Sequence, residues 1–212
     1  MGSENGRYRG LLVDYGGVLT TNLFDSFRAF CDLEGLAPES VAERFRKDTA
    51  CRELLIGLET GQIDEARFEP EFAAMLGVAE PEGLIDRLFA GSAPDPPMVD
   101  AVLAARRAGV KTGLISNSWG TRRYDRTQLA ELFDGVVISG EVGMRKPAPE
   151  MYLLGAERIG LEPSACVFVD DLPFNLEPAS DLGMATVHHV DAEQTIAQLE
   201  ELLGVRLAPS RA

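Results

Sequence analysis

The chain has 212 residues, of which 45% are hydrophobic and 25% charged, and its formal net charge is −14. Its length and composition are those of a globular protein that can bury a sizeable core. The acidic balance produces a field that repels nucleic acids and anionic membrane surfaces, and no run of lysines or arginines offsets it, which excludes both as expected partners.

The first predicted strand is the apolar run GLLVD at residues 10–14. Residues 22–96 then contain almost no β-rich run and hold segments with one apolar face, which predicts an all-helical insertion. The insertion closes with the Pro-rich stretch GSAPDPPM at residues 91–98, which suits a linker between domains. The helical segments expected within it are residues 23–36, 40–61 and 65–77.

From about Met98 onward, short apolar runs alternate with amphipathic segments. That alternation is typical of repeated βαβ units and a parallel sheet. We therefore expect an α/β protein with a three-layer α/β/α core and a mainly parallel, Rossmann-like sheet. Residues 1–21 and 97–212 would form this core, and residues 22–96 an inserted α-helical cap. The later strands are predicted to end near Asn117, Ser139, Asp171 and His189.

Polar residues follow the predicted strands or lie in the loops beside them. Ligands of an open parallel sheet bind outside the carboxyl ends of its strands, so these residues are candidates for a site. Carboxylates gathered there would raise one another's pKa values unless a cation joined them, and Mg²⁺ prefers such hard oxygen ligands. A cation would also supply the positive charge that an anionic substrate needs in so acidic a protein. The candidates are Asp14, Ser116, Asn117, Asp170 and Asp171, with Lys146 in the loop GMRKPAPEM.

Four stretches, DYGGVLT, LISNS, RKPAPEMY and VFVDDLPFN, follow one another along the chain. Their order and spacing resemble the four motifs of the haloacid dehalogenase (HAD) superfamily, over about residues 11–190. The opening Asp-Tyr-Gly-Gly-Val-Leu and the DDxxxN ending are most similar to the phosphatase-like branch with a helical cap, which includes the phosphatase-like domain of soluble epoxide hydrolases. The resemblance implies a hydrolase whose cap is inserted just after the first motif, where residues 22–96 lie.

The resemblance also implies a role for each candidate residue. Asp14 would be the nucleophile that attacks phosphorus and forms an aspartyl-phosphate, which water then hydrolyses. Mg²⁺ would be held by Asp14, the backbone carbonyl of Gly16 and Asp171, and would neutralise charge on the transferring group. The other implied roles are phosphoryl binding and catalysis by Ser116 and Lys146, substrate binding by Gly17, Asn117 and Lys146, and orientation of Lys146 by Asp170.

Gly16 departs from the family pattern, in which a second Asp at this position protonates the leaving group. General acid-base catalysis contributes about 10² to 10⁴-fold, so its loss should slow ordinary phosphomonoester hydrolysis. Three explanations stay open. The substrate has a good leaving group, as in an acyl phosphate; a cap residue or the substrate supplies the proton; or the chain is a catalytically weak ligand-binding or regulatory protein.

A haloacid dehalogenase-type hydrolase is the alternative in which the same nucleophile needs neither metal nor acid. The resemblance favours the phosphatase, because Tyr15 follows Asp14 directly, whereas dehalogenases usually carry Tyr one position later. The adjacent pair Asp170 and Asp171, which dehalogenases lack, is also intact. We therefore expect a Mg²⁺-dependent phosphatase that acts on a small phosphorylated metabolite.

Further candidates for substrate binding lie near the expected cleft. Trp119 and Arg122 follow the second motif at the start of a predicted helix. Arg28, Arg44 and Arg52 of the cap are candidates to reach the leaving group. Structural or solvated roles are the open alternative for all five.

The beginning of the chain, MGSENGRYRG, is polar and has no apolar signal core, and no segment reaches membrane-spanning length. Its three cysteines are far apart with no C-x-x-C spacing, which argues against a disulfide framework. We therefore expect a cytoplasmic protein. Its oligomeric state is left open.

Overall fold

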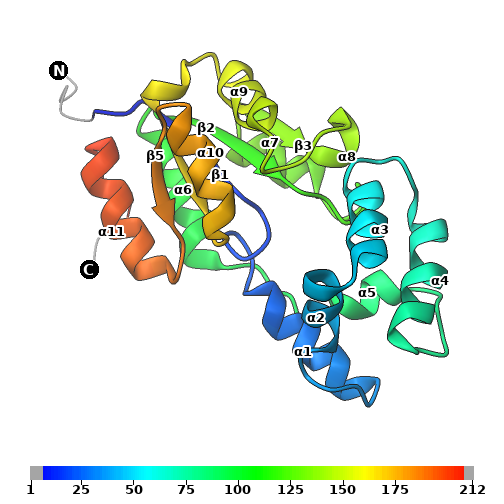
Figure 1. The fold of residues 1–212 in the computed structure, drawn as a ribbon. Coiled ribbons are helices and arrows are strands. Elements are labelled where there is room, and N and C mark those ends of the chain that lie inside the picture. Colours follow the sequence, from blue (N-terminus) through cyan, green and yellow to red (C-terminus); the bar gives the residue numbers. More distant parts are fainter. Residues whose placement is uncertain (1–6, 208–212) are drawn as a thin grey trace.

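The computed structural model describes residues 7–207, so residues 1–6 and 208–212 of the predicted core lie outside the described part. Five strands form a sheet in the order β3-β2-β1-β4-β5 (Figure 1). Every neighbouring pair of these strands is parallel, which confirms the expected α/β class. The strands are β1 (Gly10–Val13), β2 (Lys111–Ser116), β3 (Gly135–Ile138), β4 (Cys166–Asp170) and β5 (Ala185–His188).

Helices cover both faces of the sheet and make its three layers. Successive strand residues point to opposite faces, so Leu11 and Val13 enter one apolar cluster while Leu12 enters the other. Burial on both faces explains why the strands are continuous apolar runs in the sequence. The face with Leu11 and Val13 is covered by α6 (Pro96–Arg107), α7 (Arg126–Leu132) and α11 (Ala192–Leu203). The face with Leu12 is covered by α9 (Pro149–Arg158) and α10 (Pro173–Asp181). Two short elements, α8 (Ser139–Val142) and η1 (Pro163–Ala165), lie in connections.

The residues between β1 and α6 form five helices that share an apolar cluster of their own, blue to teal in Figure 1. The segment expected as one helix at residues 40–61 is two helices, because the Asp48 carboxylate caps the second of them. Among residues 7–207, no helix is long and apolar enough to cross a membrane. The five helices are α1 (Leu23–Leu33), α2 (Ser40–Lys47), α3 (Thr49–Glu59), α4 (Glu65–Leu76) and α5 (Leu84–Leu88).

Two connections join these helices to the sheet, and they pair with each other. Backbone hydrogen bonds and an antiparallel bridge link residues 19–21 to residues 93–95. Helix α6 already begins at Pro96, so the linker is shorter than the stretch 91–98 that its prolines suggested. The division into residues 1–21, 22–96 and 97–212 stays a prediction.

The prediction that a helix begins around Trp119 is wrong. Residues 117–125 form a loop, and α7 begins only at Arg126, because the Asp125 carboxylate caps its first turn. The loop lets Trp119 join the apolar cluster of helices α1 to α5 instead of covering the sheet.

Candidate active site

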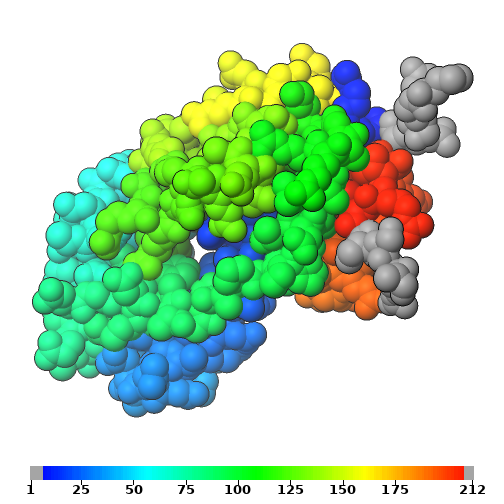
Figure 2. Space-filling model, turned by 180° about the vertical axis from the view of Figure 1, so that it is seen from behind, coloured from blue at the N-terminus to red at the C-terminus, as the bar shows by residue number. Residues whose placement is uncertain are grey.

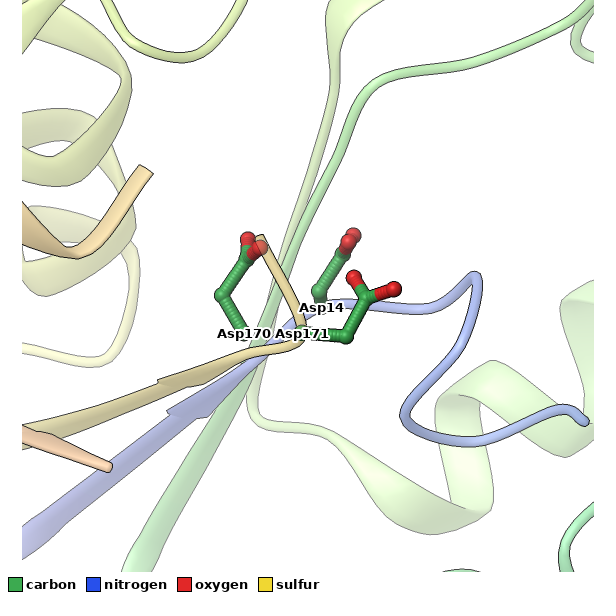
Figure 3. A group of neighbouring side chains, drawn as sticks. All are labelled: Asp14, Asp170 and Asp171. Carbon is green, nitrogen blue, oxygen red and sulfur yellow. The ribbon is translucent and has the colours of Figure 1, made fainter. Parts of the chain in front are cut away.

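Three aspartates meet at the carboxyl ends of β1 and β4. Each of Asp14, Asp170 and Asp171 offers a carboxylate oxygen, and these oxygens all lie within 4.8 Å of one another (Figure 3). They come together because β1 and β4 are neighbours in the sheet, in the register that pairs Val13 with Val169. The structure thus brings together the acidic candidates that the strand ends suggested.

Lys146 lies between two of these carboxylates. Its Nζ is 2.7 Å from Asp14 Oδ1 and 2.6 Å from Asp170 Oδ2, and its side chain is 1% exposed. Asn117 holds the Lys146 backbone from the neighbouring loop, accepting from its N–H at 2.8 Å and donating to its carbonyl at 3.1 Å. These two hydrogen bonds join the second and third sequence motifs, and they position the lysine next to Asp14.

Asp170 and Asp171 are in different environments although they are adjacent. Asp170 is fully buried, and its oxygens accept hydrogen bonds from Lys146, the Leu172 N–H and the Asn175 amide. Its carboxylate is therefore saturated by the protein. The carboxylate of Asp171 faces the β1 loop at Gly17, whose φ is +75° and where a Cβ would lie 2.5 Å from Asp171 Oδ2. Only glycine allows this approach, and it leaves Asp171 beside Asp14.

The electrostatics of the site call for a cation. Burial raises the pKa of Asp14 to about 8, with Asp170 and Asp171 adding to the rise and Lys146 opposing it. Burial and Asp170 also raise the pKa of Asp171 to about 6. Burial would lower the pKa of Lys146, but its two carboxylate partners outweigh this and raise it. Asp14 and Asp171 offer hard carboxylate oxygens beside one cavity, and one lysine does not balance the three clustered carboxylates, so the set fits Mg²⁺.

A cavity of about 240 Å³ separates the strand ends from the cap. Asp14, Lys146 and Asp171 lie on its polar side, and Gly16 and Asn117 also line it. Besides aliphatic residues such as Leu23 and Leu55, five aromatic side chains line it, from helices α1, α2 and α10 and from the loop after β2. These are Phe24, Phe27, Phe45, Trp119 and Phe174.

Glu59 and Arg145 also line this cavity, and the sequence analysis missed both. Glu59 ends α3, is 4% exposed, and places its Oε2 2.5 Å from Arg145 Nε. Burial raises the pKa of Glu59 to about 7, against the lowering effect of Arg145 and Lys146. A signal existed for Arg145, which precedes Lys146 in the third motif, but none distinguished Glu59 from the other cap glutamates.

The three cap arginines that the sequence suggested lie elsewhere. Arg28 pairs with Asp25 and Glu39, and Arg44 pairs with Asp48. Arg52 donates to backbone carbonyls and a threonine hydroxyl within the cap. None of the three lines the cavity beside Asp14, which favours the structural role that the sequence left open for them.

Ser116 faces a second, adjacent cavity. Its Oγ shares a hydrogen bond of 2.9 Å with the Tyr124 hydroxyl, and both residues line a space of about 220 Å³. Figure 2 shows the molecule hollowed at this place, between the cap and the core. Gly16 and Trp119 line both cavities and stand between them. Arg122, the other open candidate, pairs with a cap glutamate, Glu65.

The sequence matches the family model of the haloacid dehalogenase-like hydrolases over residues 8–183. The chain belongs to this family. The resemblance of its four motifs is thereby confirmed, and the HAD-like hydrolase is an enzyme. Its parallel sheet, with helices on both faces, is the α/β fold that the family resemblance implied.

Two curated relatives and one solved structure are similar to this HAD-like hydrolase. Bifunctional epoxide hydrolase 2 of Sus scrofa is 32% identical over 167 residues, which is 70% of this chain but 30% of that protein. Glyceraldehyde 3-phosphate phosphatase of Methanopyrus kandleri is 31% identical over 123 residues, covering 56% of this chain and 51% of that one. A HAD family enzyme of Bacteroides thetaiotaomicron, solved with magnesium and inorganic phosphate, superposes with a TM-score of 0.64 at 23% identity, covering 85% of this chain and 93% of that one.

The chain therefore spans about a third of the first relative's length and about half of the second's. At 23% identity, the structural similarity supports the fold alone. The HAD-like hydrolase thus has phosphatases among its relatives, while its own substrate follows from none of them.

Proposed function

We propose that the protein is a Mg²⁺-dependent phosphatase that acts on a small phosphorylated metabolite through an aspartyl-phosphate at Asp14. The observation that carries the proposal is the arrangement of Asp14, the buried Lys146 and the adjacent Asp171, which all line one cavity at the strand ends. A carboxylate nucleophile, a fixed cation and a metal-binding carboxylate are what phosphoryl transfer requires. Phosphatases among the relatives, and magnesium with phosphate in one similar structure, add support.

In this proposal Asp14, the backbone carbonyl of Gly16 and Asp171 hold the metal ion. Mg²⁺ bound there would supply charge neutralisation for the transferring phosphoryl group. Asp14 attacks phosphorus with its free oxygen. Lys146 favours the ionised form of the Asp14 carboxylate, binds a phosphoryl oxygen and is itself oriented by Asp170.

The further substrate contacts are proposed for the two loops that flank Asp14. Gly17 and Asn117 present backbone groups to the phosphoryl oxygens, while the Gly17 N–H also donates to Thr20 Oγ1 at 3.1 Å. Ser116 contributes a hydroxyl that Tyr124 holds in place. The cap covers this site and limits the access of water.

The test is phosphate release from phenyl phosphate, cyclohexyl phosphate and acetyl phosphate, measured with and without Mg²⁺. We expect Mg²⁺-dependent release by the unmodified chain, and a loss of more than about 10⁴-fold in Asp14→Asn, because no other residue replaces the attacking oxygen. Asp100→Asn is the matched control, since Asp100 is exposed on α6 away from the cavity.

The outcome separates the alternatives. Release that persists in Asp14→Asn removes Asp14 as the nucleophile. Halide release from 2-chloropropionate without metal, with no phosphate release, identifies a dehalogenase instead. Saturable binding of Mg²⁺ or a phosphorylated ligand with neither reaction identifies a binding or regulatory protein.

A further inference from the structure

Five aromatic side chains line the active-site cavity, and they come from distant parts of the chain. Phe27 of α1 and Phe45 of α2 have ring centroids 5.6 Å and 5.5 Å from that of Trp119, which belongs to the loop after β2. Phe24 and Phe174 complete this wall from α1 and from the start of α10. We call these five residues the aromatic wall.

Two rings of the aromatic wall are exposed although they are large and apolar. Phe24 is 37% and Phe174 is 55% exposed, and both line the cavity. Phe24 belongs to α1 and Phe174 to α10. An exposed apolar ring at the edge of a polar site is a typical feature of a ligand contact, since such residues otherwise favour burial.

The volume of the cavity indicates which groups fit beside Asp14. A cavity of about 150 Å³ holds a benzene molecule. Of the 240 Å³ beside Asp14, about 90 Å³ then remains, the liquid volume of about three waters and so room for the oxygens of one phosphoryl group. The space therefore suits one ring and one phosphoryl group.

The acidic groups that line the cavity are already committed. Asp14 is the proposed nucleophile and Asp171 a proposed metal ligand, while Glu59 pairs with Arg145 at 2.5 Å. Gly16 has no side chain with which to protonate a leaving group. A phenol, with a pKa of about 10, leaves as its anion far more readily than an alcohol, whose acidity is near that of water at about 15.7.

From the aromatic wall, the cavity volume and the committed acids, we propose that the substrates are small aryl phosphate monoesters whose ring binds against the aromatic wall. This inference rests on the proposed phosphatase function and names its substrate class. The phosphorus–oxygen bond to the ring breaks as Asp14 attacks, the phenolate leaves with the electron pair, and water then releases phosphate from Asp14. The phenolate takes its proton from solvent after it leaves.

The test measures binding separately from turnover. Phenylphosphonate, cyclohexylphosphonate and methylphosphonate carry a carbon–phosphorus bond that the reaction does not break, so they are titrated into the unmodified chain with Mg²⁺ present. Trp119 is the single tryptophan of the sequence and lines the cavity, so its fluorescence reports occupancy. We expect phenylphosphonate to bind about fivefold tighter than cyclohexylphosphonate, the effect of a ring–ring contact beyond buried area, and methylphosphonate to bind weakest.

Variants of the two exposed rings test whether the aromatic wall causes the preference for phenylphosphonate over cyclohexylphosphonate. Phe24→Leu and Phe174→Leu keep an apolar side chain at exposed positions, so the fold should tolerate them. Each should reduce the preference for phenyl over cyclohexyl by about half or more. Leu33→Ala, on the same helix as Phe24 but 80% exposed and outside the cavity, should leave both affinities unchanged.

Two results overturn the inference. One is equal affinity for the phenyl and cyclohexyl compounds, and the other is a preference that neither phenylalanine variant reduces. Phosphate release from esters by a chain without ring preference would leave the phosphatase proposal standing and remove this one. Ring preference without release from any ester would leave the aromatic subsite standing and remove the phosphatase proposal.

Discussion

The sheet and the helical cap line the same cavity with different kinds of side chain. The sheet brings charged groups, Asp14, Lys146 and Asp171, held by strand ends and by short hydrogen bonds. The cap brings rings such as Phe27 and Phe45, which belong to its own apolar cluster. The backbone of the sheet and its loops thus positions the charged groups of the cavity, and the packing of the helices sets the shape of the cavity.

Trp119 shows that the two regions are not independent. It follows β2 in the core, yet its ring lies within 5.3 to 5.7 Å of four cap phenylalanines, measured between centroids. The pair Glu59 and Arg145 joins the two regions on the other side of the cavity. Helices α1 to α5 are thus held over the site by contacts with the loops that carry Trp119 and Arg145.

Removing the tryptophan ring should have the largest effect. Trp119→Ala should lower the free energy of unfolding by about 3 kcal/mol, because it leaves a void among four rings. Urea unfolding followed by circular dichroism measures this. Phe174→Ala is the control, since Phe174 is 55% exposed and should change stability by about 0.5 kcal/mol or less. A loss no larger than the control's would show that the ring does not hold the cap to the core.

Introducing an acid at Gly16 should speed the hydrolysis of esters with a poor leaving group. Gly16→Asp is compatible with its backbone, whose φ is not positive, but its Cβ would lie 2.7 Å from Leu23 Cδ1. In Gly16→Asp combined with Leu23→Ala, kcat/KM for cyclohexyl phosphate should rise by about 10²-fold, since the poor leaving group gains a proton donor.

Phenyl phosphate hydrolysis by the same double variant should rise much less, because the phenolate needs no proton to leave. Leu23→Ala alone is the control for the enlarged cavity. An equal change for both esters would contradict the view that the core lacks only the acid.

Metal binding should depend on pH through the core carboxylates. The pKa of Asp14 is raised to about 8 and that of Asp171 to about 6, well above an ordinary Asp at about 3.9. Between pH 4 and pH 8 the metal-free native state therefore binds more protons than the unfolded chain, so these groups make it less stable as pH rises. Mg²⁺ must displace these protons, so it binds better at high pH.

The measurement is the rise in Tm on adding Mg²⁺, at pH 5 and at pH 8.5. At a metal concentration of about 100 times Kd, the stabilisation at the higher pH should be about 2.7 kcal/mol, and it should be much smaller at pH 5. Asp171→Asn should abolish most of it. The same rise at both pH values would argue against these aspartates as metal ligands.

Removing the ion pair between Glu59 and Arg145 should have the smallest effect. Glu59→Gln should lower kcat/KM about tenfold at pH 8, because it removes the charge of the ion pair that positions Arg145. Because the pKa of Glu59 is raised to about 7, the neutral side chain already predominates at pH 6, and the loss there should be smaller. Glu53→Gln, exposed on the same helix, is the matched control.

The comparison of esters tests the role given to Glu59. As a positioning residue it should affect phenyl and cyclohexyl phosphate by the same factor. A far larger loss with cyclohexyl phosphate would instead assign to Glu59 the proton that Gly16 does not supply.

Some site residues were predictable because local sequence places them. Asp14 follows an apolar strand and Asp170 ends another, and parallel strands bring their carboxyl ends to one edge of the sheet. Glu59 was not predictable, since it is one glutamate among several on amphipathic helices, and only the packing of α3 against the Lys146 loop buries it. The helix expected to start at Trp119 is absent there, because residues 117–125 form a loop in which Trp119 packs against the rings of helices α1 to α5.

The sequence by itself determined the α/β core, the helical insertion and the four motifs of a HAD-like hydrolase. Apolar periodicity and motif order are properties of short segments, so they are visible without packing. Only the tertiary structure decided which groups face the cavity: it saturates Asp170, leaves Asp171 beside Asp14, and turns Ser116 toward Tyr124. Such contacts join residues far apart in the chain, and they depend on how helices and strands pack.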